Sequence, residues 1–258
     1  MSHSNCHDQQ ILDQFSRQAV PFARRHRSDD ELMNLLVDSS RVRAGDRVLD
    51  VACGPGIVAC ALAPFAGHVT GLDFTPAMVA QAAALQAERR LDNLEWRQGS
   101  AMKLPFEEAQ FDLVVARFSF HHYLEPIAAF REMVRVCQPG GRILVADVAP
   151  RANARDAYDA LEKQRDPSHT HALTEEEFDR LGDSSGAALL SKVRYDLASD
   201  VEGLLASSFP PPGGADAFRR MVEADIDAQN DSLGIRAHRS NGLINFYFPV
   251  LIAAWKKR

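Results

Sequence analysis

The order of apolar segments between residues 47 and 148 constrains this chain more than any other feature. Short apolar runs alternate with longer segments of helical periodicity, which we expect at about 57–65, 76–90 and 126–136. Strands that alternate with helices form right-handed βαβ units around a parallel sheet that is buried on both faces. The expected strands are Arg47–Ala52, Val69–Asp73, Leu94–Gln98, Phe111–Ala116 and Arg142–Val148.

A glycine-rich loop follows the first expected strand. Asp50 lies near the end of that strand, and Gly54-Pro55-Gly56 leads from it into the next helix. Glycine allows a ligand to approach the main chain closely. Ligands of open α/β sheets bind at this carboxyl edge. The loop therefore predicts a cofactor site.

Two classes of cofactor fit this loop. Gly54-x-Gly56-x-x-Ala59 matches a loose dinucleotide fingerprint, and Asp73 after the second strand could then hold a ribose hydroxyl. S-adenosylmethionine (SAM) fits as well, because it has a sulfonium and an ammonium group but no phosphate. An acid at Asp50 suits a cationic ligand and would repel a pyrophosphate. The loop favours SAM but leaves a nicotinamide-dependent dehydrogenase as an alternative.

Five blocks in a fixed order resemble class I SAM-dependent methyltransferases, most closely the ubiquinone/menaquinone-type group that acts on small molecules. Together they cover about residues 40–150, and residues 151–258 match only loosely. The order of the blocks favours the methyl donor over the dinucleotide. The blocks are Val48-Leu49-Asp50-Val51-Ala52-Cys53-Gly54-Pro55-Gly56, Val69 to Met78, Gly99 to Phe106, Phe111 to Val115 with His121-His122-Tyr123, and Arg135 to Arg142.

The resemblance implies a role for each matching position. Asp50 and the loop would contact the methionine part of SAM, Asp73 would accept from both ribose hydroxyls, and Arg117 would lie near the methionine part. Ala52 replaces a usual glycine, and Ser100 replaces a usual aspartate, so the adenine contact is weaker. The implied cofactor residues are Asp50, Ala52, Gly54, Gly56, Asp73, Phe74, Met78, Ser100, Ala101 and Arg117.

The resemblance also implies the fold. We expect one α/β domain with a Rossmann-like, seven-stranded, mostly parallel sheet in the order 3-2-1-4-5-7-6, helices on both faces and an antiparallel last strand. Residues 1–40 would form a helical lid, residues 41–150 the cofactor-binding core, and residues 151–258 a variable part on the substrate side. Later elements are expected at Arg155–Arg165, Leu189–Asp196, 215–231 and Leu243–Lys256.

Methyl transfer needs alignment of the acceptor, exclusion of water and, for some acceptors, removal of a proton. His121 and His122 follow the fourth strand and are candidate bases, because imidazole accepts a proton near neutral pH. Each could instead be a packing residue. Phe15, Phe22 and His169 are candidate substrate residues, with core packing or a surface turn as the alternative. No cluster with the spacing of metal ligands is present.

Charge and composition narrow the partners. The chain carries 29 Lys and Arg against 35 Asp and Glu, a net charge of −6, which argues against a nucleic-acid partner. The polar N-terminus and the lack of a long apolar run predict no membrane association and a cytoplasmic location. We expect a monomer or homodimer that methylates a partly apolar or aromatic metabolite. A relative that binds SAM without transferring methyl is the remaining alternative.

Overall fold

The computed structural model describes the backbone of residues 3–25 and 30–258, with side chains from 6–20 and 31–258. Within these residues a single sheet has the strand order β3-β2-β1-β4-β5-β8-β6, and the short strand β7 pairs with β8. The pairs β1–β2, β1–β4, β2–β3 and β4–β5 are parallel, and β8 is antiparallel to both β5 and β6. This confirms the predicted Rossmann-like order and the antiparallel last strand.

The strands lie close to their predicted positions, and most differences are at their ends. Pro139-Gly140-Gly141 is a sequence typical of a turn, but these residues belong to β5, whose pairing with β4 shifts register between Phe111 and Leu113. The observed strands are β1 Arg47–Val51, β2 His68–Asp73, β3 Leu94–Gln98, β4 Phe111–Arg117, β5 Cys137–Val148, β6 Ala187–Asp200, β7 His238–Ser240 and β8 Leu243–Lys257.

The last strand shows why a proline is tolerated in its middle. Strand β8 runs through Pro249 without a break. Its pairing with β5 ends at Val250, so the missing N–H of Pro249 falls just beyond that ladder. Strand β8 is therefore continuous through Pro249.

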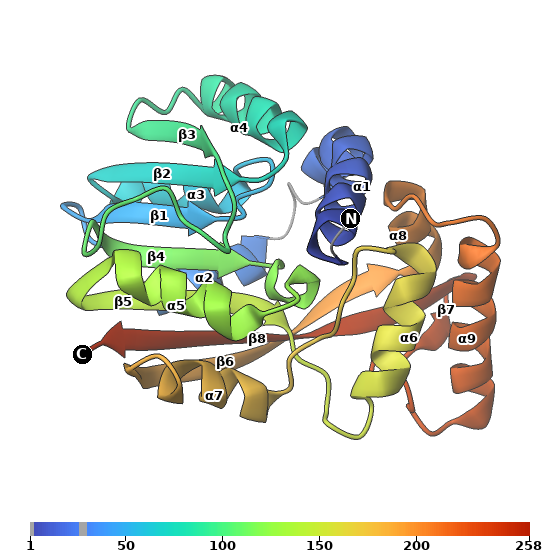
Figure 1. The fold of residues 1–258 in the computed structure, drawn as a ribbon. Coiled ribbons are helices and arrows are strands. Elements are labelled where there is room, and N and C mark those ends of the chain that lie inside the picture. Colours follow the sequence, from blue (N-terminus) through green and yellow to red (C-terminus); the bar gives the residue numbers. More distant parts are fainter. Residues whose placement is uncertain (1–2, 26–29) are drawn as a thin grey trace.

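Helices cover both faces of the sheet (Figure 1). Along β4, Val114 and Ala116 pack with α5 and α7, whereas Leu113 and Val115 pack with α2, α3 and α4. This alternation has the period of two that a strand imposes. The described helices are α1 His3–Arg25, α2 Asp30–Ser40, α3 Ile57–Leu62, η2 Ala63–Phe65, α4 Pro76–Arg89, η3 Phe120–His122, α5 Pro126–Val136, α6 Arg155–Arg165, α7 Glu175–Asp183, α8 Val201–Ser207 and α9 Gly214–Ala228.

The elements after β5 build a second apolar cluster beside the sheet. Helices α6, α8 and α9 bury Tyr158, Leu204 and Phe218 against one another, and they lie beyond the carboxyl ends of the parallel strands (Figure 1). Helix α1 contacts both α4 and α8. Helix α1 therefore lies between α4, which packs beside β2 and β3, and the cluster that α6, α8 and α9 form.

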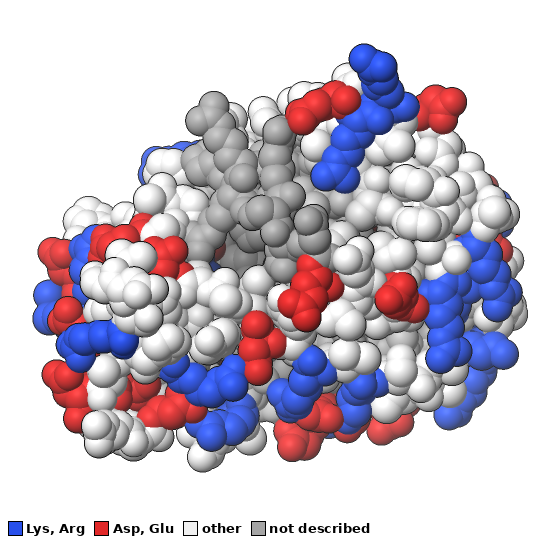
Figure 2. Space-filling model, turned by 180° about the vertical axis from the view of Figure 1, so that it is seen from behind, with Lys and Arg blue, Asp and Glu red and all other residues white. Residues whose placement is uncertain are grey.

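Charges are mixed on the outer surface. On the face drawn in Figure 2, basic and acidic side chains are interspersed, most densely along the lower edge. Such a mixed surface differs from the continuous basic face that a nucleic-acid-binding protein presents.

Candidate functional site

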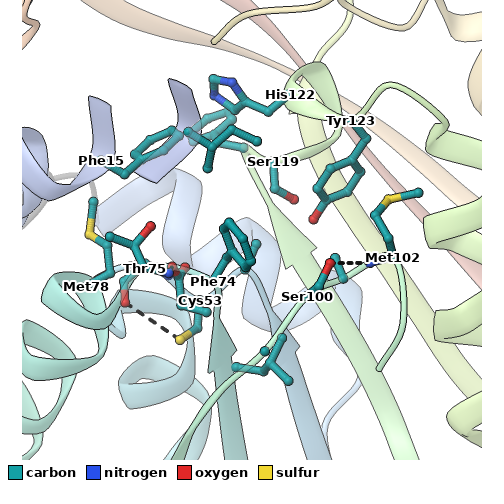
Figure 3. A pocket seen from close by; sticks show the side chains of 18 of the residues that line it. Phe15, Cys53, Phe74, Thr75, Met78, Ser100, Met102, Ser119, His122 and Tyr123 are labelled. Carbon is teal, nitrogen blue, oxygen red and sulfur yellow. Dashed lines mark hydrogen bonds between the residues drawn. The ribbon is translucent and has the colours of Figure 1, made fainter. Parts of the chain in front are cut away.

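A cavity of about 460 Å³ lies at the carboxyl ends of β1, β2 and β4, under helix α1. Figure 3 shows that its lining has two different ends. Cys53, Phe74, Thr75, Met78 and Ser100 lie at one end, and Phe15, Ser119, His122 and Tyr123 lie at the other. The cavity can therefore hold two ligand groups side by side.

The glycine loop has the backbone that its sequence predicted. Gly54 has φ +52°, and a Cβ there would meet none of the described atoms within 4 Å, so bare backbone faces open space. Gly56 has φ +81° and precedes α3, and its Cβ would lie 2.6 Å from the Trp96 ring. Ala52, in place of the usual glycine, adopts φ +54°. Left-handed backbone favours glycine, so Gly56 is required for both conformation and space.

Asp73, the last residue of β2, ties this loop to the second strand. Its two carboxylate oxygens accept from the backbone N–H groups of Gly54 and Thr75, both at 2.8 Å. Asp73 also lines the cavity, and an ionised carboxylate only accepts hydrogen bonds. Burial raises the pKa of Asp73. This arrangement fits a ligand that presents a pair of hydroxyl groups.

Asp50 is a buried carboxylate below the loop. It accepts from the Ala59 N–H at 3.0 Å, which holds the start of α3 against β1. Burial, with a smaller contribution from Asp73, raises the pKa of Asp50 to about 8. A cationic ligand in the cavity would favour its ionised form, so the site fits the ammonium and sulfonium groups of SAM.

The remaining predicted cofactor residues also lie around the cavity. Phe74, Met78, Ser100 and Ala101 line it together with Asp50, Ala52, Gly54 and Arg117. The Ser100 hydroxyl already accepts from the Met102 N–H at 3.2 Å. Arg117 stacks over the Phe118 ring at 4.6 Å, and its charge counteracts part of the rise in the pKa of Asp50.

The two candidate bases have different surroundings. His121 donates from Nδ1 to Asp147 at 2.6 Å and is not among the described residues that line the cavity. Burial opposes its protonation, but the Asp147 carboxylate prevails and raises the pKa of His121. Burial alone would raise the pKa of Asp147, yet His121 holds it below its usual value. His121 and Asp147 therefore form a buried ion pair that supports η3.

His122 lines the cavity. Its ring meets the edge of Phe15 with a centroid separation of 5.0 Å. Burial, then the neighbouring His121, lowers the pKa of His122 to about 3. The imidazole of His122 is therefore neutral at physiological pH.

Of the three candidate substrate residues Phe15, Phe22 and His169, only Phe15 is among the described residues that line the cavity. Phe15 lies in the cavity wall. His169 is buried behind it, with Nε2 bound to Asp159 at 2.8 Å, and is not among the described lining residues. The side chain of Phe22 lies outside the described residues.

The structure adds cavity residues that the sequence patterns did not single out. His7 lines the cavity, and its Nε2 donates to the His122 carbonyl at 2.7 Å. His7, Ile11 and Phe15 share one face of α1 at helical spacing, a signal that could have identified His7. Ser119 and Tyr123 also line the cavity, and burial raises the pKa of Tyr123.

In the described ranges, no three or more His, Cys, Asp and Glu side chains gather in a way that could hold a metal ion. Every helix described is too short or too polar to cross a bilayer.

Comparison with known proteins identifies the family. Residues 49–145 match the model of a methyltransferase domain. The Escherichia coli K12 protein YafE is 32% identical over 58% of this chain and 74% of its own length. This chain belongs to the methyltransferase family.

Two further relatives agree with this assignment. The methyltransferase YcgJ of Bacillus subtilis strain 168 is 26% identical over 90% of this chain and 92% of its own length. Its crystal structure superposes with a TM-score of 0.80 at 25% identity, covering 88% of this chain and 97% of that one. The chloroplastic 2-phytyl-1,4-beta-naphthoquinone methyltransferase of Arabidopsis thaliana is 36% identical, but only over 44% of this chain and 46% of its own length.

The family assignment selects one of the two cofactors that the loop allowed. Structural neighbours with this fold have been crystallised with SAM or with its product S-adenosylhomocysteine (SAH). At 16% and 18% identity these neighbours show the fold alone, and the family match makes the protein a methyltransferase. The groups described above fit the ammonium, sulfonium and ribose groups of SAM, because two buried carboxylates and an open glycine loop face the same cavity.

Proposed function

We propose that this methyltransferase acts on a small, partly apolar or aromatic metabolite, at an oxygen, nitrogen or carbon nucleophile, and releases SAH. One observation carries the proposal: the acidic, glycine-lined end of the cavity continues directly into an end formed by Phe15, Ser119, His122 and Tyr123. Aromatic side chains around a few polar groups are typical of small-molecule sites.

The acidic end is proposed to hold the cofactor. Asp73 would accept from the ribose hydroxyls, and Asp50 would compensate the cationic methionine part. Burial makes both contacts stronger than they would be in water. The residues proposed to contact SAM are the cavity-lining Asp50, Ala52, Gly54, Asp73, Phe74, Met78, Ser100, Ala101 and Arg117. Gly56 is proposed as well, although it is not among the described lining residues.

Bound SAM supplies a methyl group that is already activated by its sulfonium. The chain's own part is to align the acceptor and exclude water, which α1 does by covering the cavity. His122 is the proposed base. The neighbouring His121 is held by Asp147 outside the lining of the cavity. For a hydroxyl acceptor the proton becomes strongly acidic as oxygen bonds to the methyl carbon, so a weak base such as His122 suffices to take it at Nε2.

The remaining expectations about the molecule extend the proposal. Residues 1–258 would act as one domain, with 1–40 as the lid, 41–150 as the cofactor core and 151–258 shaping the acceptor end. The net charge of −6 and the mixed surface in Figure 2 support a small molecule over a nucleic acid as substrate. Such an enzyme would work in the cytoplasm as a monomer or homodimer.

An extract screen tests the substrate class. The protein would be incubated with SAM labelled on its methyl group and a cell extract separated into metabolite, protein and RNA fractions. We expect the label in one or a few metabolites, which mass spectrometry identifies, with an equal amount of SAH formed. Label recovered only in protein or RNA would contradict the proposal.

A further inference from the structure

The turn that follows α6 lies directly behind His122. This turn is Asp166-Pro167-Ser168-His169, and it ends at the candidate substrate residue His169. In the structure, Asp166 and Ser168 are buried and are not among the described residues that line the cavity. Their contacts lead instead to the ring of His122.

Asp166 determines the shape of this turn. Its Oδ1 accepts from the Ser168 N–H at 2.9 Å and from the Ser168 hydroxyl at 2.5 Å. Such Asx turns hold the backbone two residues ahead of the aspartate. The Ser168 carbonyl then lies 3.1 Å from Nδ1 of His122, and the Ser168 hydroxyl oxygen lies 3.2 Å from the same nitrogen. The same segment also binds the backbone beside His122, because Thr170 donates from its N–H and its hydroxyl to the His121 carbonyl, at 2.9 and 2.8 Å.

These contacts determine which nitrogen of His122 carries the hydrogen. A carbonyl oxygen can only accept, so the contact with Ser168 requires a hydrogen on Nδ1. The ring is neutral, since it is buried beside His121, whose ring centroid lies 4.2 Å away. Nε2 therefore keeps its lone pair, and the hydrogen bonds found for His122 within the described residues involve Nδ1 and the backbone.

We propose that Asp166 and Ser168 are positioning residues that hold His122 as the Nδ1–H tautomer, so that Nε2 accepts a hydrogen bond from the methyl acceptor. The acceptor then belongs to the class that carries a hydroxyl or an N–H group at or beside the methylated atom. This inference rests on the proposed function, because it takes the aromatic end of the cavity as the acceptor site.

Nitrogen-15 NMR of protein labelled at histidine reads the tautomer directly. The chain has nine histidines, and a His122→Gln variant assigns the signals of His122. In the SAH-loaded wild type we expect one protonated nitrogen, Nδ1, and one unprotonated nitrogen, Nε2. A hydrogen on Nε2, or on both nitrogens at neutral pH, would overturn the proposal.

Two substitutions at Asp166 separate positioning from folding. Asp166→Ala removes both accepted bonds, so we expect a mixture of tautomers and a fall in kcat of about tenfold or more, with KM for SAM unchanged. Asp166→Asn keeps an Oδ1 that can accept both bonds, and it should restore the single tautomer and most of kcat. Wild-type tautomer and kcat in a folded Asp166→Ala protein would overturn the proposal.

Asp225→Ala is the matched control. Asp225 is also a buried aspartate that holds a loop, since it accepts from the Ser232 hydroxyl at 2.7 Å and from the Leu233 N–H at 3.2 Å, but it is not among the described cavity residues. The Asp225→Ala variant should be less stable than the wild type, with unchanged NMR signals of His122. A change of the His122 tautomer in this control would overturn the specific role of Asp166.

Failure of the proposed function is distinguishable from failure of this inference. SAH binding by calorimetry and label transfer from SAM test the function, whereas the tautomer is read without an acceptor. A wild type that transfers methyl but holds His122 as the Nε2–H tautomer would refute only the positioning role.

Discussion

At the residue scale, buried carboxylates at the strand ends account for the chemistry of the site. Asp50 and Asp73 carry raised pKa values because burial disfavours their charge, and Asp147 is held below its usual pKa by His121. A positively charged ligand beside Asp50 and Asp73 would lower the free-energy cost of burying their ionised carboxylates. The cofactor end is therefore incomplete in electrostatic terms until a cationic ligand binds.

Replacing Asp73 with Ala should weaken SAH binding by about 10- to 100-fold, because charge-assisted hydrogen bonds contribute about 1.5–3 kcal/mol. The variant also loses the two bonds that hold the loop. Calorimetric titration measures the change. Asp46→Ala is the control, since Asp46 is a buried carboxylate before β1, at the opposite edge, and binds Arg43 and Arg142. Equal affinities for wild type and Asp73→Ala would contradict the assignment.

The raised pKa of Asp50 predicts a pH dependence of stability. Because the folded state binds this proton more tightly than the unfolded state, the contribution is complete below the ordinary pKa and is lost as pH rises toward about 8. Ligand-free protein should therefore lose melting temperature between about pH 4 and about pH 8, and the rise in melting temperature caused by SAH should grow over the same interval. Asp50→Asn should flatten both trends. Identical pH profiles for wild type and variant would count against this account.

At the element scale, the glycine loop and α1 form the floor and the cover of the cavity. Loop, strand and helix were predictable from local patterns, because glycine spacing and apolar periodicity are local properties. The boundaries of β5 and β6 were not, since a bulge and a long antiparallel pairing depend on the neighbouring strands.

Gly56→Ala should destabilise the protein by about 2 to 4 kcal/mol, because left-handed strain adds to a collision with the Trp96 ring. Gly213→Ala is the matched control. It has φ +78° with none of the described atoms within 4 Å of the added Cβ, so it should cost only about 1 kcal/mol. Chemical denaturation measures both, and equal costs would show that the contact with Trp96 is unimportant.

Deleting residues 1–27 should raise the SAH dissociation constant, because α1 contacts α4 over the cofactor end and His7 donates to His122 at the acceptor end. His7→Ala is a milder test of the same cover, expected to act mainly on the acceptor. An unchanged SAH dissociation constant in a folded deletion variant would refute the lid.

At the scale of the whole molecule, the sequence predicted the cofactor half better than the acceptor half. Asp50, Asp73 and Gly54 follow from motifs within one βαβ unit. The roles of His7, Asp147 and the Asp166 turn depend on contacts between distant parts of the chain, which local patterns do not contain. The same holds for His169, which sequence placed in the pocket and the structure places behind it.

A crystal structure of the SAH complex tests the central claim most directly. The account predicts ribose hydroxyls on the Asp73 carboxylate, adenine beside Phe74 and Met78, and the sulfur directed toward the end of the cavity that contains Phe15 and His122. Density for SAH elsewhere in the molecule, or with its sulfur directed away from that end, would contradict the account.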